Sequence, residues 1–255
     1  MTSLQIIILI LIAIPFLLIL LLVAEGLIAM SGEKIIFQNP DPSPVIIGDA
    51  PSKINYLVLG DSAAAGQGAD YSKGIAMQTG LNLTSKYTVT LTNLSQSGAT
   101  TQDLISKQLE QATKLKPDLV LISISANDLT HLTSTKTIKD NLKTIIEELI
   151  LAKCDIKIVL TGTPDMGSVV RFLQPLRWLA GYQTKVQNQV FDQIIQEYEV
   201  TLAPIAKQTG PAFRADHSLF AEDRFHPNER GYALWTAVIN QAIEKSLIDQ
   251  PSHCK

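Results

Sequence analysis

The chain begins with a long apolar run that contrasts with the mixed pattern of everything after it. Residues 6–23 have the sequence IIILILIAIPFLLILLLV, eighteen residues without a charged or polar side chain. This length approaches the roughly 20 residues that a helix needs to cross a bilayer. It exceeds the roughly 7 to 15 apolar residues of a secretory signal, and no Lys or Arg precedes it. We therefore predict that residues 1–30 form an uncleaved transmembrane anchor, with a cleaved signal sequence as the alternative.

The region after the anchor, residues 31–54, differs in composition from both of its neighbours. It is rich in Pro, Asp and Ser and lacks periodic apolar positions, a pattern typical of an extended linker. Lys34 is the first positive side chain of the protein, so flanking charge determines the orientation of the anchor only weakly. We expect a single-pass protein of the cell membrane whose folded domain, residues 55–250, lies on the extracytoplasmic side.

From residue 55 onward, short runs of β-forming residues alternate with longer segments of helical period. The predicted strands are 56–60, 87–94, 118–124, 156–161 and 199–204. The predicted helices are 73–85, 101–115, 135–153, 183–198 and 227–248. This alternation predicts an α/β fold with a parallel sheet covered by helices on both faces. Ligands bind such sheets outside the carboxyl ends of the strands, so the residues after each strand are the candidates for chemistry.

Composition argues against two kinds of partner. The formal net charge is −3 and the chain has no dense run of Lys or Arg, so neither nucleic acid nor anionic lipid headgroups are expected to bind by charge. The two cysteines, Cys154 and Cys254, are too few for a disulfide framework or a Cys-based zinc site. We expect them to be unlinked thiols, because disulfide geometry is demanding.

A Gly-rich turn follows the first predicted strand and contains Gly60, Asp61 and Ser62. The spacing of its glycines fits neither a P-loop nor a dinucleotide fingerprint, which argues against a phosphate site. The G-x-S-x-G elbow of the α/β-hydrolases is absent from the whole chain. A serine at a strand end can be a nucleophile, whereas the plain alternative is a turn in which Asp61 and Ser62 cap a helix.

The next two predicted strands also end in residues suited to binding an oxyanion. Gly98 follows the second strand, and Asn127 with Asp128 follows the third. A glycine lets a backbone N–H approach a substrate closely, and an Asn amide adds a donor without a charge. Each has a structural alternative, since Gly98 can serve a turn and the Asn-Asp pair can cap a helix.

An Asp/His pair, Asp223 and His226, lies just before the last predicted helix. Pro227 suits the first turn of that helix, which puts His226 at or before its N-terminus. Three residues upstream, Asp223 can hold one ring nitrogen while the other accepts a proton from a serine. The remaining histidines have no metal-ligand spacing around them, so we expect no metal site.

Taken in order, these four segments resemble the sequence blocks of the SGNH hydrolases, also called GDSL esterases and lipases. The blocks contain Ser62, then Gly98, then Asn127, and finally Asp223 with His226. The resemblance covers about residues 55 to 248. It implies a flavodoxin-like three-layer α/β/α sandwich with about five parallel strands.

The same resemblance implies a serine esterase that uses no metal or cofactor. Ser62 would be the nucleophile, His226 the general base and then acid, and Asp223 its orienting partner. The backbone N–H groups of Ser62 and Gly98 and the side-chain amide of Asn127 would form the oxyanion hole. The implied reaction is hydrolysis of a carboxylic ester in two steps through an acyl-enzyme.

One position departs from the pattern of that family. Its third block usually has Gly-x-Asn-Asp, whereas this chain has Ser125 at the glycine position. The substitution can shift the donor geometry of Asn127 and lower the rate. Two alternatives therefore remain beside the ester hydrolase: a catalytically silent carbohydrate- or lipid-binding domain on the same fold, and an acyltransferase that uses the same residues.

The segment 168–182, which follows the fourth predicted strand, is rich in apolar residues. They are Val169, Val170, Phe172, Leu173, Leu176, Trp178 and Leu179. They can line an acyl pocket or touch the bilayer, but packing into the core of the domain is the favoured expectation. The expected substrates are acyl esters of small molecules, lipids or glycans, among which the sequence does not choose.

Overall fold

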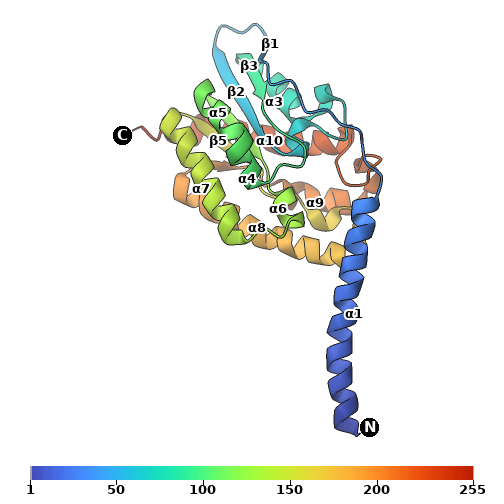
Figure 1. Cartoon of the computed structure of the whole chain (residues 1–255). Coiled ribbons are helices and arrows are strands. Elements are labelled where there is room, and N and C mark those ends of the chain that lie inside the picture. Colours follow the sequence, from blue (N-terminus) through green and yellow to red (C-terminus); the bar gives the residue numbers. More distant parts are fainter. Residues whose placement is uncertain (1, 255) are drawn as a thin grey trace.

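A six-stranded sheet lies at the centre of the molecule (Figure 1) in a computed structural model that describes residues 2–254. The strands are β1 (Val45–Ile47), β2 (Lys53–Gly60), β3 (Thr88–Asn93), β4 (Leu119–Ser123), β5 (Lys157–Leu160) and β6 (Thr201–Leu202). Their order is β1-β3-β2-β4-β5-β6, with β1 antiparallel to β3 and all other neighbours parallel. The order of the parallel strands is that of flavodoxin-like folds, as predicted.

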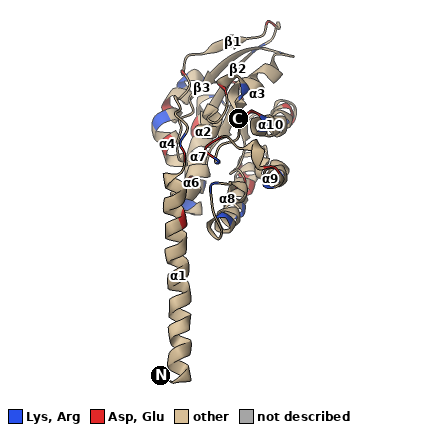
Figure 2. Ribbon diagram, turned by 90° about the vertical axis from the view of Figure 1, so that its right-hand side faces the viewer, with Lys and Arg blue, Asp and Glu red and all other residues tan. Residues whose placement is uncertain are grey.

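Helices cover both faces of this sheet. They are α2 (Ser62–Ala65), α3 (Ile75–Leu83), α4 (Thr101–Leu104), α5 (Glu110–Leu115), α6 (Ala126–Thr130), α7 (Thr135–Ala152), α8 (Leu176–Tyr198), α9 (Ile205–Ala215) and α10 (Glu229–Asp249). One core layer joins α3, α9 and α10 to the sheet, on the side where Figure 2 shows these three helices. The other layer joins α4, α5, α7 and α8 to the opposite face. The predicted three-layer sandwich is therefore confirmed.

Alternating side chains of each central strand supply these two core layers. In β2, Tyr56 and Val58 belong to one layer and Leu57 and Leu59 to the other. All four are at most 1% exposed, because a parallel strand covered on both faces has no solvated side. This explains why the strands form continuous apolar runs in the sequence.

Three helical segments differ from the sequence-based prediction. Helix α8 begins at Leu176 rather than at residue 183, and α9 lies in a segment that was not predicted to be helical. Gly181 in α8 and Pro211 in α9 are poor helix formers, so local propensity pointed away from both. Packing outweighs that propensity, since Gly181 lies directly against the backbone of Gly167. The predicted helix 101–115 is present but contains a π-helical turn, Ile105–Leu109.

The predicted linker contains part of the sheet. Strand β1 pairs with β3 through the register Val45↔Leu91, and β2 already begins at Lys53. Strand β1 is a Val-Ile-Ile run of three residues flanked by turn residues, and this is too short to show the alternation that predicts a strand. Residues 45–47 therefore belong to the edge of the folded sheet.

The N-terminal helix α1 (Ser3–Ser31) extends away from the sheet layers and contacts them only at its C-terminal end (Figures 1 and 2). It is long and apolar enough to cross a membrane. Only Glu25 and Ala29 are buried within it. No Lys, Arg, Asp or Glu precedes Glu25 in the sequence, and Figure 2 shows the part of α1 that extends from the folded domain almost entirely without charged residues. The last turns of α1 are therefore docked on the folded part of the protein.

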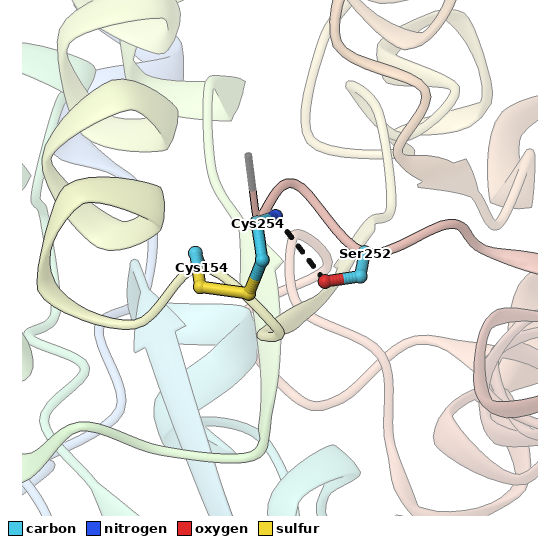
Figure 3. Close-up of a disulfide and its surroundings, with 3 residues drawn as sticks. All are labelled: Cys154, Ser252 and Cys254. Carbon is cyan, nitrogen blue, oxygen red and sulfur yellow. Dashed lines mark hydrogen bonds between the residues drawn. A yellow bond between two sulfur atoms is a disulfide. The ribbon is translucent and has the colours of Figure 1, made fainter.

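The two cysteines form a disulfide, so the prediction of unlinked thiols was wrong. Cys154 follows α7 and Cys254 follows α10, and the bond joins them across a separation of 100 residues (Figure 3). Their Cα atoms are 4.8 Å apart, within the range that a disulfide requires. Sequence spacing could not reveal this proximity, because it depends on α7 and α10 ending at the same end of the sheet.

Candidate active site

Three of the predicted residues form one hydrogen-bonded chain. The Nε2 atom of His226 lies 2.8 Å from Ser62 Oγ, and His226 Nδ1 lies 2.6 Å from Asp223 Oδ2. Ser62 is 7% exposed and the Asp223 side chain 2%, so the chain is largely shielded from water but still reachable at the serine. In this geometry the imidazole can accept the serine proton while the carboxylate holds the ring in place.

The turn before α10 fixes the positions of Asp223 and His226 relative to each other. Asp223 Oδ1 accepts the backbone N–H groups of Phe225 and His226, each at 3.0 Å. An isolated β-bridge between Phe220 and Pro227 closes the turn. Helix α10 begins two residues later than predicted, at Glu229, because the side chain of Asn228 caps it.

The pKa of Asp223 lies below its ordinary value. Burial by itself opposes ionisation and raises this pKa, but the hydrogen bonds and charge of His226 and the backbone N–H groups of Phe225 and His226 outweigh it. The carboxylate is therefore ionised across the neutral pH range. This is the form that can accept Nδ1–H and stabilise a protonated imidazole.

Ser62 is held at a tight junction between β2 and α2. It is the first residue of α2, whose N-cap is Asp61, so the Ser62 N–H has no partner within the helix. Gly68, which follows α2 in the same loop, has φ +102°, and a side chain there would collide with the backbone of Pro227. Because Gly68 has no side chain, the serine loop and the histidine loop can approach each other closely.

Gly98 and Asn127 come from the two strands beside β2. The loops are tied together by backbone bonds from Gln96 N–H to Gly60 O and from Asp61 N–H to Ser123 O, both 3.1 Å. Gly98 has φ +82°, and open space surrounds the position a side chain would take. The Nδ2 atom of Asn127 donates to Ala99 O at 3.0 Å, which orients the amide and leaves its second N–H available.

Ser125 adopts a conformation that explains why glycine is usual at this position. Its φ is +98°, in the left-handed region that costs a residue with a side chain about 1 kcal/mol or more. The fully buried hydroxyl is held by a 2.6 Å hydrogen bond with Thr163 Oγ1, which also donates to Gln187 Oε1 at 3.0 Å. These contacts offset the strain and keep α6, with Asn127, in position.

Two buried carboxyl groups lie beneath the site. Asp128 accepts the backbone N–H and the hydroxyl of Thr101, at 2.9 and 2.7 Å. Asp61 caps α2, and burial, with a further contribution from the charge of Asp128, raises the pKa of Asp61 to about 7. Asp61 is therefore only partly ionised at neutral pH.

An apolar hollow lies beside Ser62 and His226. Its wall is built mainly of large apolar side chains from η3 (Met166–Ser168), α9, α10 and the adjoining loops: Met166, Val169, Phe213, Phe220, Phe225 and Trp235. Asp165 also lines it, but its carboxylate is paired with Arg214 at 2.7 and 2.8 Å. Within the described chain, no cluster of three or more His, Cys, Asp or Glu could hold a metal ion. The hollow therefore suits an apolar group.

Two residues that the sequence analysis missed support the site from outside the sheet layers. Asn39 in the predicted linker accepts the backbone N–H of Ser97 at 2.8 Å, next to Gly98. Arg171 donates to the carbonyl of Asp223 at 3.3 Å and to that of Ala29 in α1 at 2.6 Å. Both contacts join segments far apart in sequence, so no local pattern signals them.

Comparison with known proteins shows the family of this chain. A model of the GDSL-like lipase/acylhydrolase family matches residues 58–234. A GDSL-like esterase of Mycobacterium tuberculosis is 27% identical over 215 residues, which cover 80% of this chain and 67% of that protein. The family match spans every residue of the candidate site from Ser62 to His226.

Solved structures show the same fold at low sequence identity. An acetylxylan esterase from Geobacillus stearothermophilus, solved as a catalytic mutant, has a TM-score of 0.61 at 19% identity and covers 77% of this chain and 95% of its own. A lipase/acylhydrolase from Enterococcus faecalis has a TM-score of 0.61 at 23% identity, covering 75% and 96%. These likenesses establish the shared architecture alone.

The strain at Ser125 predicts an order of stability for two variants. Ser125→Ala and Ser125→Gly both lose the hydroxyl bonded to Thr163, but only alanine keeps a side chain at positive φ. We expect the free energy of unfolding of Ser125→Ala to be lower than that of Ser125→Gly by about 1 kcal/mol. This difference already includes the greater entropy that glycine gives to the unfolded chain. Denaturant unfolding of the two proteins measures the difference. Equal stability, or a more stable alanine variant, would show that the backbone here is unstrained.

Proposed function

Because the chain belongs to the GDSL-like lipase/acylhydrolase family, it is an ester hydrolase, and we propose that it works through an acyl-enzyme formed on Ser62. The observation that carries this proposal is the chain of hydrogen bonds from Ser62 through His226 to Asp223, at 2.8 and 2.6 Å. A serine, an imidazole and an ionised carboxylate in this order are the parts that nucleophilic acyl transfer requires.

In the first half-reaction, Ser62 Oγ attacks the ester carbonyl carbon and its proton passes to His226 Nε2. The carbonyl electrons move onto the oxygen of the tetrahedral intermediate. The intermediate collapses when the bond to the alcohol oxygen breaks and His226 returns the proton to that oxygen. Asp223 stays ionised and holds the Nδ1–H throughout. The products of this step are a free alcohol and an acyl group on Ser62.

In the second half-reaction, water repeats the attack on the acyl group. His226 takes a proton from the water, a second tetrahedral intermediate forms, and its collapse returns the proton to Ser62 Oγ and releases a carboxylic acid. The resting enzyme is restored without a metal or a cofactor. An acceptor alcohol in place of water would give acyl transfer by the same residues.

The oxyanion of both intermediates is proposed to bind three N–H donors. These are the backbone N–H groups of Ser62 and Gly98 and the second amide N–H of Asn127. Two observations support this assignment. The three residues follow the ends of three adjacent strands, and open space lies beside Gly98. Losing one such donor in other hydrolases lowers kcat by about 100- to 1,000-fold.

The proposed substrate is an acyl ester whose acyl part is apolar. The hollow beside Ser62 is lined by aromatic and aliphatic side chains, which favour a hydrocarbon group over a charged one. The alcohol part can belong to a small molecule, a lipid or a glycan.

We further propose that α1 is a single transmembrane anchor and that the catalytic part, which includes strand β1 and extends to the disulfide at Cys254, lies on the extracytoplasmic side. Helix α1 has the length and composition of a membrane span. The Cys154–Cys254 disulfide supports the outward orientation, because such bonds persist mainly in oxidising compartments.

Removing the serine hydroxyl tests the proposed chemistry. Ser62→Ala should lower kcat for p-nitrophenyl esters by at least about 1,000-fold, because no other group in the site replaces the nucleophile. A fluorophosphonate probe should label the wild type but not the variant. Ser106→Ala, at an exposed serine outside the site, should match the wild type in both measurements. Wild-type turnover by Ser62→Ala would rule out the acyl-enzyme.

The contact of Asn39 with the Gly98 loop gives a second prediction. Asn39→Ala removes the acceptor of the Ser97 N–H, so the loop should hold the neighbouring Gly98 N–H less firmly toward the oxyanion. We expect kcat to fall about fivefold with little change in KM, as for the loss of one hydrogen bond worth about 1 kcal/mol. The adjacent, exposed Gln38→Ala is the matched control. A changed KM with unchanged kcat would refute a role at the oxyanion.

The redox state of the cysteines in intact host cells tests the orientation. Alkylation with a maleimide mass tag before reduction should leave the protein unmodified, whereas prior reduction should add two tags. Cells that yield two tags without reduction would place the catalytic part in a reducing compartment and contradict the proposed topology.

A further inference from the structure

Large apolar side chains are exposed at one end of α8 and just before it. Leu173 is 45% exposed, Trp178 67% and Tyr182 54%. The rings of Trp178 and Tyr182, four residues apart on one face of the helix, stack with their centroids 6.3 Å apart. The neighbouring Val169, Val170 and Phe172 are buried as expected, whereas the expectation of core packing was wrong for Leu173 and Trp178. Large apolar side chains grouped together on the surface are candidates for contact with a protein or a membrane.

This corner is fixed at a defined level along α1. Glu25, 4% exposed, accepts the backbone N–H of Leu176 at 2.9 Å, at the first residue of α8. Arg171 Nε donates to Ala29 O at 2.6 Å one turn further along α1. Each of these hydrogen bonds involves a backbone group, of α8 in the first case and of α1 in the second. They hold the first residue of α8 at the level of Glu25.

That level coincides with the end of the apolar run. Residues 6–23 rise about 27 Å along a helix, close to the roughly 30 Å of bilayer hydrocarbon. Glu25 follows two residues later, about 3 Å further along the axis, at the depth of the headgroups. Figure 1 shows α8 running crosswise to α1 at the end of the folded part from which α1 emerges. The start of α8 therefore lies at the height of the headgroup layer.

We propose that Leu173, Trp178 and Tyr182 are inserted in the headgroup region of the bilayer that α1 spans, so that the catalytic part rests against this membrane. The inference depends on the proposed anchoring by α1. Trp and Tyr are the residues enriched at membrane–water interfaces, because their rings are apolar while their N–H and O–H groups remain hydrated.

The contact is limited to the first two turns of α8. Further along the same exposed face the side chains become polar, with Lys185, Gln189 and Asp192 following Tyr182 at helical spacing. These side chains offer no continuous apolar surface to insert into the bilayer. Helix α8 thus touches the bilayer at its α1 end and leaves it toward its C-terminus.

This contact holds the active site next to the membrane surface. Arg171, which binds α1 at Ala29, also donates to the carbonyl of Asp223. Phe172 packs edge-on against Phe225, whose ring in turn contacts His226, at centroid distances of 5.9 and 5.0 Å. The segment that meets the lipid is therefore in direct contact with the turn that carries the proposed base.

Depth-dependent fluorescence quenching of the full-length protein tests the proposal. Trp178 and Trp235 are the two tryptophans, so Trp235→Phe leaves Trp178 as the sole reporter. In phosphatidylcholine vesicles, lipids brominated close to the ester carbonyls should quench Trp178 strongly, and its emission should shift to shorter wavelength. A variant with Trp178→Phe, Trp235→Phe and Tyr182→Trp should respond in the same way.

Two further single-tryptophan proteins, made in the Trp178→Phe, Trp235→Phe background, serve as controls. Asp192→Trp, on the same face of α8, should stay unquenched and accessible to aqueous acrylamide. Leu17→Trp, in the middle of the apolar run, should be quenched by lipids brominated deep in the chains.

The controls separate the possible failures. Quenching of Leu17→Trp without quenching at position 178 would overturn the membrane contact of α8 and leave the anchor intact. Absence of quenching at position 17 would overturn the anchor and this proposal with it. Equal quenching at positions 178 and 192 would contradict the limit to the first two turns. None of these results bears on the role of Ser62, which is tested by activity.

Discussion

The candidate site depends on the parallel pairing of β2 with β3 on one side and with β4 on the other. Parallel strands must all end at the same edge of a sheet, and the register pairs Val58 with Asn93 and Gly60 with Ser123. The loops that follow therefore start side by side. Burial of both faces fixes this register, since a slip of one residue would turn each strand's side chains to the opposite core layer. This constraint is the reason that the three residues proposed to bind the oxyanion, Ser62, Gly98 and Asn127, come from neighbouring loops.

The Asp223/His226 pair does not follow a strand of the sheet but precedes helix α10. His226 lies 164 residues after Ser62 in sequence, and packing of α10 against the sheet brings the preceding turn over the end of β2. Asp223 accepts hydrogen bonds from within the same turn, so local contacts fix the positions of Asp223 and His226 relative to each other. The absence of a side chain at Gly68 gives the turn room to reach the serine.

The segments before strand β2 make specific contacts with the sheet and with the candidate site. Strand β1 extends the sheet, Asn39 contacts the loop of Gly98, and Arg171 connects the end of α1 to Asp223. The Asp223 side of the proposed catalytic centre is therefore hydrogen-bonded through Arg171 to the end of α1, the proposed anchor. The composition of residues 31–54, rich in Pro and Asp, fits an irregular chain that packs through specific polar contacts instead of a periodic apolar face.

The sequence by itself determined the α/β class, the five parallel strands, the candidate site residues and the apolar N-terminal helix. The fold class and the N-terminal helix follow from periodicity and from one uninterrupted apolar run. The site residues follow from their positions at strand ends together with the resemblance to the SGNH hydrolases. Only the tertiary structure decided that Cys154 and Cys254 are bonded, that α8 begins at Leu176, that β1 joins the sheet and that Ser125 stands at positive φ. Each of these depends on contacts between segments far apart in the chain, where packing outweighs local propensity and leaves no mark in the sequence pattern.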